Sequence, residues 1–288
     1  MSVLSKSNPQ VRVNRRRKTE QTILIFSLGF LAFLGLFPYI FMVLTSFKNN
    51  QQFVDSYWGL PVPIHFENYA AAWEQTKNYF ATTFIVVAAT IAATLFLGLL
   101  SGFILSRFIF VGRQFLFTCV GLLLMVPWIA ALIPLFVLSK DLKMLNTIWV
   151  LIVPMIAGNA VLSVILFKNY IDAVPQELFD CAVVFGATGP QIFRYVVVPL
   201  SFPVVGTISL LTMINVWNEY FWPLLTVTDD TLRTVSVGIT FFQGQNETDY
   251  GGLMAGYTLA SIPLLLLFTF LSKYLLAGIQ GGLSVSDK

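Results

Sequence analysis

The sequence is short of charge and of the residues most often used in catalysis. Only 11% of its 288 residues are Asp, Glu, Lys or Arg, and it contains one histidine and two cysteines. Cys119 falls inside a long apolar stretch and Cys181 inside a polar segment, so the pair supports neither a disulfide nor a metal framework. His65 has no cysteine or second histidine nearby in the sequence, which argues against a metal site or a catalytic role.

Several motifs of enzymatic chemistry are also missing. The sequence has no Gly-x-x-x-x-Gly-Lys-Ser/Thr phosphate loop, so the chain is not expected to bind and split ATP by that route. It has no Gly-x-Ser-x-Gly elbow and no His-Glu-x-x-His site, which argues against a hydrolase within a membrane. We therefore expect no catalytic residue in this chain.

What the sequence has in abundance is apolar length. Hydrophobic residues make up 57% of the chain, far more than in an ordinary soluble domain. Stretches of roughly twenty apolar residues, each long enough to cross a hydrocarbon core of about 30 Å, lie near 22–44, 80–105, 115–138, 147–167, 201–225 and 253–277. The prediction is an all-α, polytopic membrane protein with six transmembrane helices, in which both termini lie on the same side.

The basic residues indicate the orientation. Twelve of the 17 Lys and Arg residues fall on the side of the two termini, six of them before the first span, and five fall on the other side. This bias places both termini in the cytoplasm. The arginine run before the first span could also belong to a nucleic-acid-binding tail or a cleaved signal peptide, but the net charge of +3 and the long following apolar stretch favour a signal anchor.

A polar segment between the fourth and fifth spans, VPQELFDCAVVFGATGPQIFRYVVVPL, stands out on the cytoplasmic side. Glu177 and Asp180 suit the N-terminal part of a helix, and Gly186 suits its end in a left-handed conformation. Thr188 and Gln191 are spaced as a capping box for a second helix. Four small or apolar residues at helical spacing predict one face that fits a partner's groove: Leu178, Cys181, Ala182 and Phe185.

This segment resembles the EAA loop of the inner-membrane permease subunits of bacterial ABC importers, through Asp180-Cys181-Ala182, Gly186 and Pro199-Leu200. Asp180 and Cys181 stand where that family has Glu and Ala, and Phe185 stands where an acidic residue is common. The resemblance implies the type I ABC importer permease fold and a coupling loop at 168–200 whose first helix docks on a separate ATPase. It assigns this coupling role to the following residues: Glu177, Asp180, Cys181, Ala182, Phe185, Gly186 and Ala187.

A second polar cluster lies in the fifth span and resembles the NxWNEYxWPL signature of carbohydrate-importer permeases. A carboxylate is costly in hydrocarbon, so Glu219 is expected at a bundle interior, a watery cavity or the outer interface. Amides and aromatic rings suit a transient sugar path, and polar contacts between helices explain them equally well. The residues assigned to a translocation path are Asn215, Trp217, Asn218, Glu219 and Tyr220.

Further expectations concern the outer loops and the tails. After an extended arm in the first outer loop, a short interfacial helix is predicted to begin near Glu67 or Asn68. Similarity to maltose-type permeases implies that the second large outer loop contacts an external sugar-binding protein through Gln243, Gly244, Gln245 and Asn246. The domain prediction is a cytoplasmic tail at 1–21, the permease domain at 22–277 and a cytoplasmic tail at 278–288 whose part 280–283 touches the ATPase.

Two functions of different class follow. The first is a permease subunit in the bacterial plasma (inner) membrane that imports a sugar, such as a di- or oligosaccharide, together with a second permease subunit, two ATP-binding subunits that use ATP and Mg, and a solute-binding protein. The second is a proton-coupled secondary carrier that uses Glu219. A carrier is expected to show internal repeats, and no convincing repeat relates the first three spans to the last three.

Overall fold

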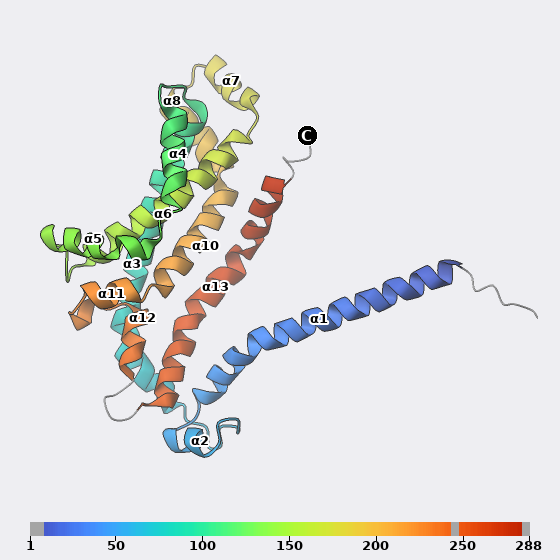
Figure 1. The fold of residues 1–288 in the computed structure, drawn as a ribbon, viewed down its shortest axis with the longest axis vertical. Coiled ribbons are helices and arrows are strands. Elements are labelled where there is room, and N and C mark those ends of the chain that lie inside the picture. Colours follow the sequence, from blue (N-terminus) through green and yellow to red (C-terminus); the bar gives the residue numbers. More distant parts are fainter. Residues whose placement is uncertain (1–8, 243–247, 284–288) are drawn as a thin grey trace, which may run out of the picture.

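The computed structural model describes residues 9–242 and 248–283, with side chains placed from 20 to 240 and from 248 to 270. Within that part the chain is a bundle of helices joined by short turns (Figure 1). Their bounds follow: α1 Pro9–Thr45, α2 Asn50–Asp55, α3 Glu67–Arg107, α4 Arg113–Leu123, α5 Trp128–Asp141, α6 Ile148–Asp172, α7 Gln176–Val184, α8 Gly189–Ile192, η1 Phe193–Val197, α9 Val198–Leu200, α10 Phe202–Asn218, α11 Phe221–Thr226, η2 Asp230–Leu232, α12 Val235–Gly238, η3 Ile239–Phe242 and α13 Tyr250–Leu283.

Four helices are long and apolar enough to cross a membrane on their own, and two bent helix pairs raise the number of candidate spans to six. The four lie in α1, α3, α6 and α13. The third predicted span, 115–138, is not straight: α4 and α5 meet at an angle of 97°. The segment from α8 to α9 meets α10 at 72°, and α10 itself ends at Asn218, inside the predicted fifth span. Six spans are thus confirmed only if each bent pair counts as one.

The predicted helix of the first outer loop begins at the expected place but is not separate. α3 starts at Glu67 and continues without a break to Arg107, so the predicted interfacial helix and the second span form one helix of 41 residues. The separate short helix of this loop is α2, which begins after Asn49. Asn49 and Gln52 cap it reciprocally, through the Asn49 side chain on the Gln52 N–H at 2.8 Å and the Gln52 side chain on the Asn49 N–H at 3.0 Å.

The largest helix–helix contact of the described chain joins α3 to α6. It is close because α3 buries a small residue at every fourth position, which allows the two backbones to approach: Thr90, Thr94, Gly98, Gly102 and Ser106. Ser163 of α6 lies over Gly98 and donates a hydrogen bond of 3.2 Å to the carbonyl of Thr94.

At the opposite end of the bundle from α7, a buried lysine joins the turn after α1 to the loop after α2. The Lys48 side chain is only 1% exposed, and its Nζ donates to the carbonyls of Ser56 at 2.9 Å and Tyr57 at 3.0 Å. Burial lowers the pKa of Lys48. Asn68 donates to the carbonyl of Lys48 at 2.9 Å, and Gly251 at the start of α13 lies so close that a Cβ there would come within 2.1 Å of the same carbonyl oxygen.

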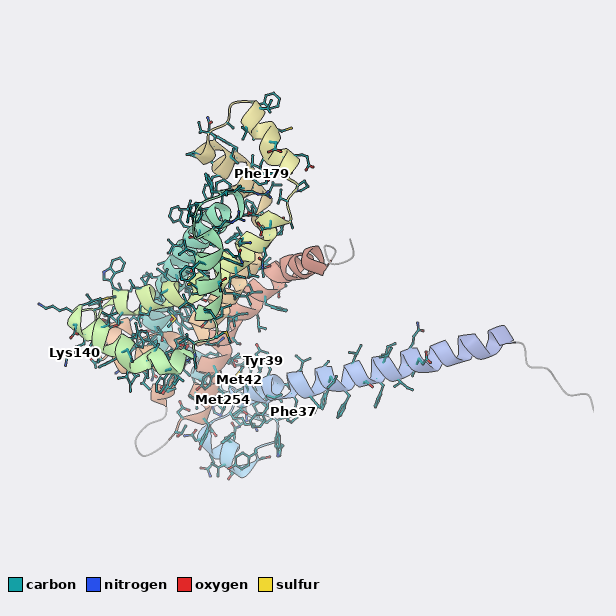
Figure 2. The ribbon with its side chains drawn as sticks, turned by 45° about the horizontal axis from the view of Figure 1, so that its top comes forward. Phe37, Tyr39, Met42, Lys140, Phe179 and Met254 are labelled. Carbon is teal, nitrogen blue, oxygen red and sulfur yellow. The ribbon has the colours of Figure 1, made fainter. Side chains whose placement is uncertain are left out.

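Helix α1 leaves this end and runs away from the other helices (Figure 1). The most apolar 18 residues of its segment Glu20–Thr45 are all unburied within the chain. Contact with the bundle is confined to its C-terminal end, where Figure 2 shows Tyr39 and Met42 beside Met254 of α13. There the hydroxyl of Tyr39 lies 3.3 Å from Oγ of Ser261.

The α3–α6 contact predicts a strong effect for a single methyl group. A Cβ at Gly102 would lie 2.8 Å from Cβ of Phe167 and 2.9 Å from the backbone nitrogen of Lys168, and neither can move without shifting α6. We expect Gly102→Ala to destabilise the purified protein by about 1–3 kcal/mol, as overpacking of a close contact does, measured as a lower Tm in detergent. Gly158→Ala is the matched control in α6, where a Cβ meets nothing within 4 Å; equal Tm values for the two variants would contradict the role of the contact.

Candidate coupling loop and path-lining site

Helix α7 ends as the sequence predicts. Gly186 has φ of +79°, the left-handed region that glycine adopts without a steric penalty. Its N–H donates to the carbonyl of Val183 at 2.9 Å, and the N–H of Ala187 donates to that of Ala182 at 3.0 Å, which together form a Schellman motif. The turn that follows is closed by the Thr188 N–H, which donates to the side chain of Gln191 at 2.7 Å. Both capping predictions are confirmed.

The end of α7 carries an exposed apolar tip, defined here as Val183, Val184 and Phe185. Their exposed fractions are 60%, 84% and 89%. These three consecutive apolar side chains form a surface that no part of the described chain covers, and an exposed apolar patch is a candidate interaction site. The left-handed turn at Gly186 fixes the direction in which this tip points.

The structure divides the predicted coupling residues into two groups. Glu177, Asp180 and Cys181 are exposed. Ala182 and Ala187 instead pack against a buried cluster within the chain that includes Phe179, which is 5% exposed. Leu178, Cys181 and Phe185 are exposed, whereas Ala182 lies on the side of the helix that Phe179 turns toward the bundle, so the four residues do not form one exposed face.

Arg107 holds α7 onto the bundle. From the sequence this residue contributes only to the charge bias between the two sides of the membrane. At the end of α3 its guanidinium donates to the carbonyls of Ile171 at 2.5 Å and Val174 at 2.7 Å, and to the side chain of Gln176 at 2.5 Å. It also lies 4.0 Å from the ring centroid of Phe179 (labelled in Figure 2), a cation–π contact. One side chain thus binds α3, the end of α6 and α7 together.

A second polar contact reinforces the same junction. Both carboxylate oxygens of Asp172, the last residue of α6, are used: Ser106 of α3 donates to one at 2.5 Å, and Lys168 forms an ion pair of 2.5 Å with the other. Asp172 therefore ties α3 to α6 directly before the turn into α7. The bundle end nearest α7 is consequently rigid.

The polar cluster of the fifth span surrounds a break in the helix. α10 ends at Asn218, and Glu219 has φ of −67° and ψ of 116°, which is outside the helical region. The Glu219 carboxylate accepts from the N–H of Trp222 at 3.0 Å and so caps the start of α11. The Glu219 side chain is half-buried and lies at the break between α10 and α11.

The two tryptophans of the cluster are buried anchors. Trp217 is 3% exposed and its Nε1 donates to the carbonyl of Ala260 in α13 at 3.1 Å. Trp222 is fully buried and its Nε1 donates to the carbonyl of Val150 in α6 at 2.8 Å. Asn215 donates to Asn159 of α6 at 3.3 Å. These three residues connect helices, which is the structural alternative that the sequence left open.

Asn218 and Tyr220 face open space. With Trp217 they line a cavity of about 440 Å³ between α10, α12, η3 and α13, a size within the usual range for ligand pockets. Four residues that carry hydroxyl groups also line it: Ser236, Thr240, Tyr257 and Ser261.

The predicted binding-protein contacts Gln243, Gly244, Gln245 and Asn246 lie outside the described residues.

The site therefore belongs to a helical chain with four helices, or up to six spans, of membrane-crossing length and with an exposed short helix, α7, at one end. In the part of the chain that the structure describes, no group of three or more His, Cys, Asp or Glu residues is placed to hold a metal ion.

Comparison with known proteins identifies the family. The family of binding-protein-dependent transport system inner membrane components matches residues 94–281, and the chain belongs to it. A probable ABC transporter permease protein of Bacillus subtilis, YurM, is 33% identical over 95% of this chain and 92% of that protein. The trehalose/maltose transport system permease protein MalG of Thermococcus litoralis is 29% identical over 93% and 98%. This chain is thus an integral inner membrane transport component, without an ATPase site of its own.

The fold agrees with that assignment. A chain in the crystal structure of a bacterial ABC transporter involved in the import of the acidic polysaccharide alginate superposes with a TM-score of 0.79, covering 90% of this chain and 98% of that one at 21% sequence identity. The fold is that of an ABC importer permease.

The Arg107 junction predicts a local loss of order when its side chain is removed. In Arg107→Ala the carbonyls of Ile171 and Val174 lose a charged donor, and hydrogen bonds to charged groups contribute about 1.5–3 kcal/mol each. We expect amide hydrogen exchange across Gln176–Val184 to accelerate at least about tenfold, measured by mass spectrometry, since 1.4 kcal/mol corresponds to that factor.

Arg113→Ala is the control, because it removes a cation from the same end of the bundle without touching the contacts of Arg107. Unchanged exchange in α7 of Arg107→Ala would show that Arg107 does not hold the helix.

Proposed function

We propose that this chain is a permease subunit of an ABC importer that moves an oligosaccharide into the cytoplasm by alternating access. The observation that carries the proposal is the exposed apolar tip of α7, held rigidly by Arg107 in a chain of this family. Relatives support the substrate class: their names include transport systems for arabinooligosaccharides, for melibiose, raffinose and stachyose, and for lactose.

The proposed complex contains this chain, one related permease subunit, two ATP-binding subunits that hold ATP and Mg, and an extracytoplasmic solute-binding protein. The apolar tip is the surface offered to an ATP-binding subunit, together with the exposed Glu177, Asp180 and Cys181. Ala182 and Ala187 support this surface from behind, and Gly186 sets its direction. The apolar length of α1, which is unburied within the chain, is offered to the second permease and to lipid.

The proposed orientation places both termini and α7 in the cytoplasm. The positive residues support it, and α7 lies at the end of the bundle opposite α2 (Figure 1). In this orientation the loop that contains 243–246 lies outside, where a solute-binding protein docks, and the end of α13 lies near the ATP-binding subunits. These two assignments rest on sequence resemblance.

The proposed mechanism is mechanical. Closure of the ATP-binding subunits moves α7, and the contacts of Arg107 and Asp172 transmit that movement to α3 and α6 as one body. The break after α10 places Asn218 and Tyr220 at the proposed path, where an amide and an aromatic ring suit sugar hydroxyls and an apolar sugar face. Asn215, Trp217 and Glu219 keep the broken span in place around them.

The tip of α7 supplies the sharpest test. Phe185→Ser removes the most exposed apolar side chain of the tip, and loss of a central aromatic anchor at an interface costs about 2 kcal/mol or more. We expect at least about tenfold less ATP-binding subunit to copurify at limiting concentration, or a matching loss of sugar-stimulated ATP hydrolysis in lipid nanodiscs.

The matched control is Tyr195→Ser, which alters another exposed aromatic residue of the same loop, at 69% exposure. Full assembly and full stimulation of Phe185→Ser would contradict docking through the tip. Absence of any copurifying ATP-binding subunit with the unaltered chain would overturn the importer itself, and the sugar that stimulates hydrolysis identifies the substrate.

A further inference from the structure

We infer that Asn146 is a positioning residue that ties the turn after α5 to the end of α11, so that α5 and α11 move with α6 as one unit during transport. The inference rests on the proposed function and extends it to a residue that lies in neither the coupling loop nor the polar cluster of the fifth span. Asn146 stands in the turn between α5 and α6.

Three hydrogen bonds join this one residue to the segment that leaves α11. The N–H of Asn146 donates to the carbonyl of Thr226 at 2.9 Å. Its side-chain oxygen accepts from two successive backbone N–H groups, those of Thr228 at 3.0 Å and Asp229 at 2.8 Å. Asn146 therefore provides hydrogen-bond partners for the carbonyl of Thr226 and for the two N–H groups that follow α11, although it lies 82 residues before Thr228 in the chain.

The turn that holds Asn146 is itself fixed. Asn146 has φ of +59°, a left-handed conformation that asparagine tolerates better than most residues with a side chain. The N–H of Met144 donates back to the carbonyl of Ser139 in α5 at 2.9 Å, and the hydroxyl of Thr147 donates to the carbonyl of Met144 at 2.6 Å. Because the turn is bonded to α5 on one side and leads directly into α6 on the other, Asn146 fixes α11 to both.

Two further contacts attach the same region to the rest of the bundle. Trp222 in α11 donates to the carbonyl of Val150 in the first turn of α6. Beyond α11, the hydroxyl of Tyr79 in α3 donates to Asp230 at 2.9 Å. The α3–α6 pair that Arg107 joins to α7 at one end thus holds α11 at the other, and Asn146 adds hydrogen bonds from the turn after α5, whose Leu132, Leu135 and Phe136 pack against the same core. A movement of α7 then reaches α5 and α11 together.

A graded series of variants separates the hydrogen bonds from the backbone conformation. Asn146→Asp keeps an acceptor for both N–H groups and tolerates the left-handed conformation. Asn146→Gly keeps the conformation and removes the acceptor. Lys143→Gly is the matched control: Lys143 also has positive φ, at +56°, in the same turn, and its exposed side chain is absent from these contacts.

The first measurement is amide hydrogen exchange on the purified chain. We expect faster exchange at Thr228 and Asp229, at least about tenfold, in Asn146→Gly, and wild-type exchange in Asn146→Asp and Lys143→Gly. The second is the amount of sugar transported per ATP hydrolysed by the reconstituted complex. We expect this ratio to fall at least about fivefold in Asn146→Gly while ATP hydrolysis continues, because α5 and α11 no longer follow α7.

Each outcome decides a different statement. Unchanged exchange at Thr228 and Asp229 in Asn146→Gly would show that the Asn146 side chain does not hold these two residues, which overturns the inference even if that variant transports poorly. Faster exchange with an unchanged sugar-to-ATP ratio would show that the link exists and does not serve coupling, which overturns the inference. An unaltered complex that hydrolyses ATP without any dependence on sugar would count against the proposed function instead, and the exchange experiment would still decide the link.

Discussion

The structure depends above all on the close approach of α3 and α6. Lipid tails are as apolar as the side chains of these helices, so hydrophobic burial drives helix association weakly in a membrane, and close packing with interhelical hydrogen bonds must supply it. The small residues of α3 at every fourth position provide this: Ser163 rests on Gly98 and donates to the carbonyl of Thr94, and Phe167 rests on Gly102. A pair packed this closely has one arrangement, and for that reason it can carry a displacement along its length.

Each end of the α3–α6 pair holds a short helix, α7 at one end and α11 at the other. α7 has nine residues and α11 has six, too few for a helix to be stable alone. Arg107 and Asp172 position the first, and Trp222 with Asn146 positions the second. In the proposed mechanism the polar groups at the two ends are the points at which movement enters and leaves the pair, while the apolar middle only has to stay intact.

The sequence predicts the features that depend on neighbouring residues, and it does not predict the contacts between residues far apart in the chain. Gly186 and the Thr188–Gln191 cap were predictable because each needs only its neighbours in the chain. The bends were not, since proline alone does not mark them: Pro154 and Pro263 lie inside unbroken helices. Arg107 binds Gln176 across 69 residues and Asn146 binds Thr228 across 82, so nothing near either residue in the sequence indicates its partner.

The chain exposes two apolar surfaces, one on α1 and one at the tip of α7, and their surroundings differ. The apolar length of α1 belongs to a candidate membrane span, where contact with lipid satisfies it. Helix α7, which carries the apolar tip, also exposes the charged side chains of Glu177 and Asp180, which are costly in hydrocarbon. The proposed orientation therefore places the tip in water, where the exposed ring of Phe185 is unfavourable without a partner. Glu219, the group on which a proton-coupled carrier would depend, already serves as the cap of α11. A carrier therefore leaves the exposed tip unexplained, whereas a permease that docks on an ATP-binding subunit requires it.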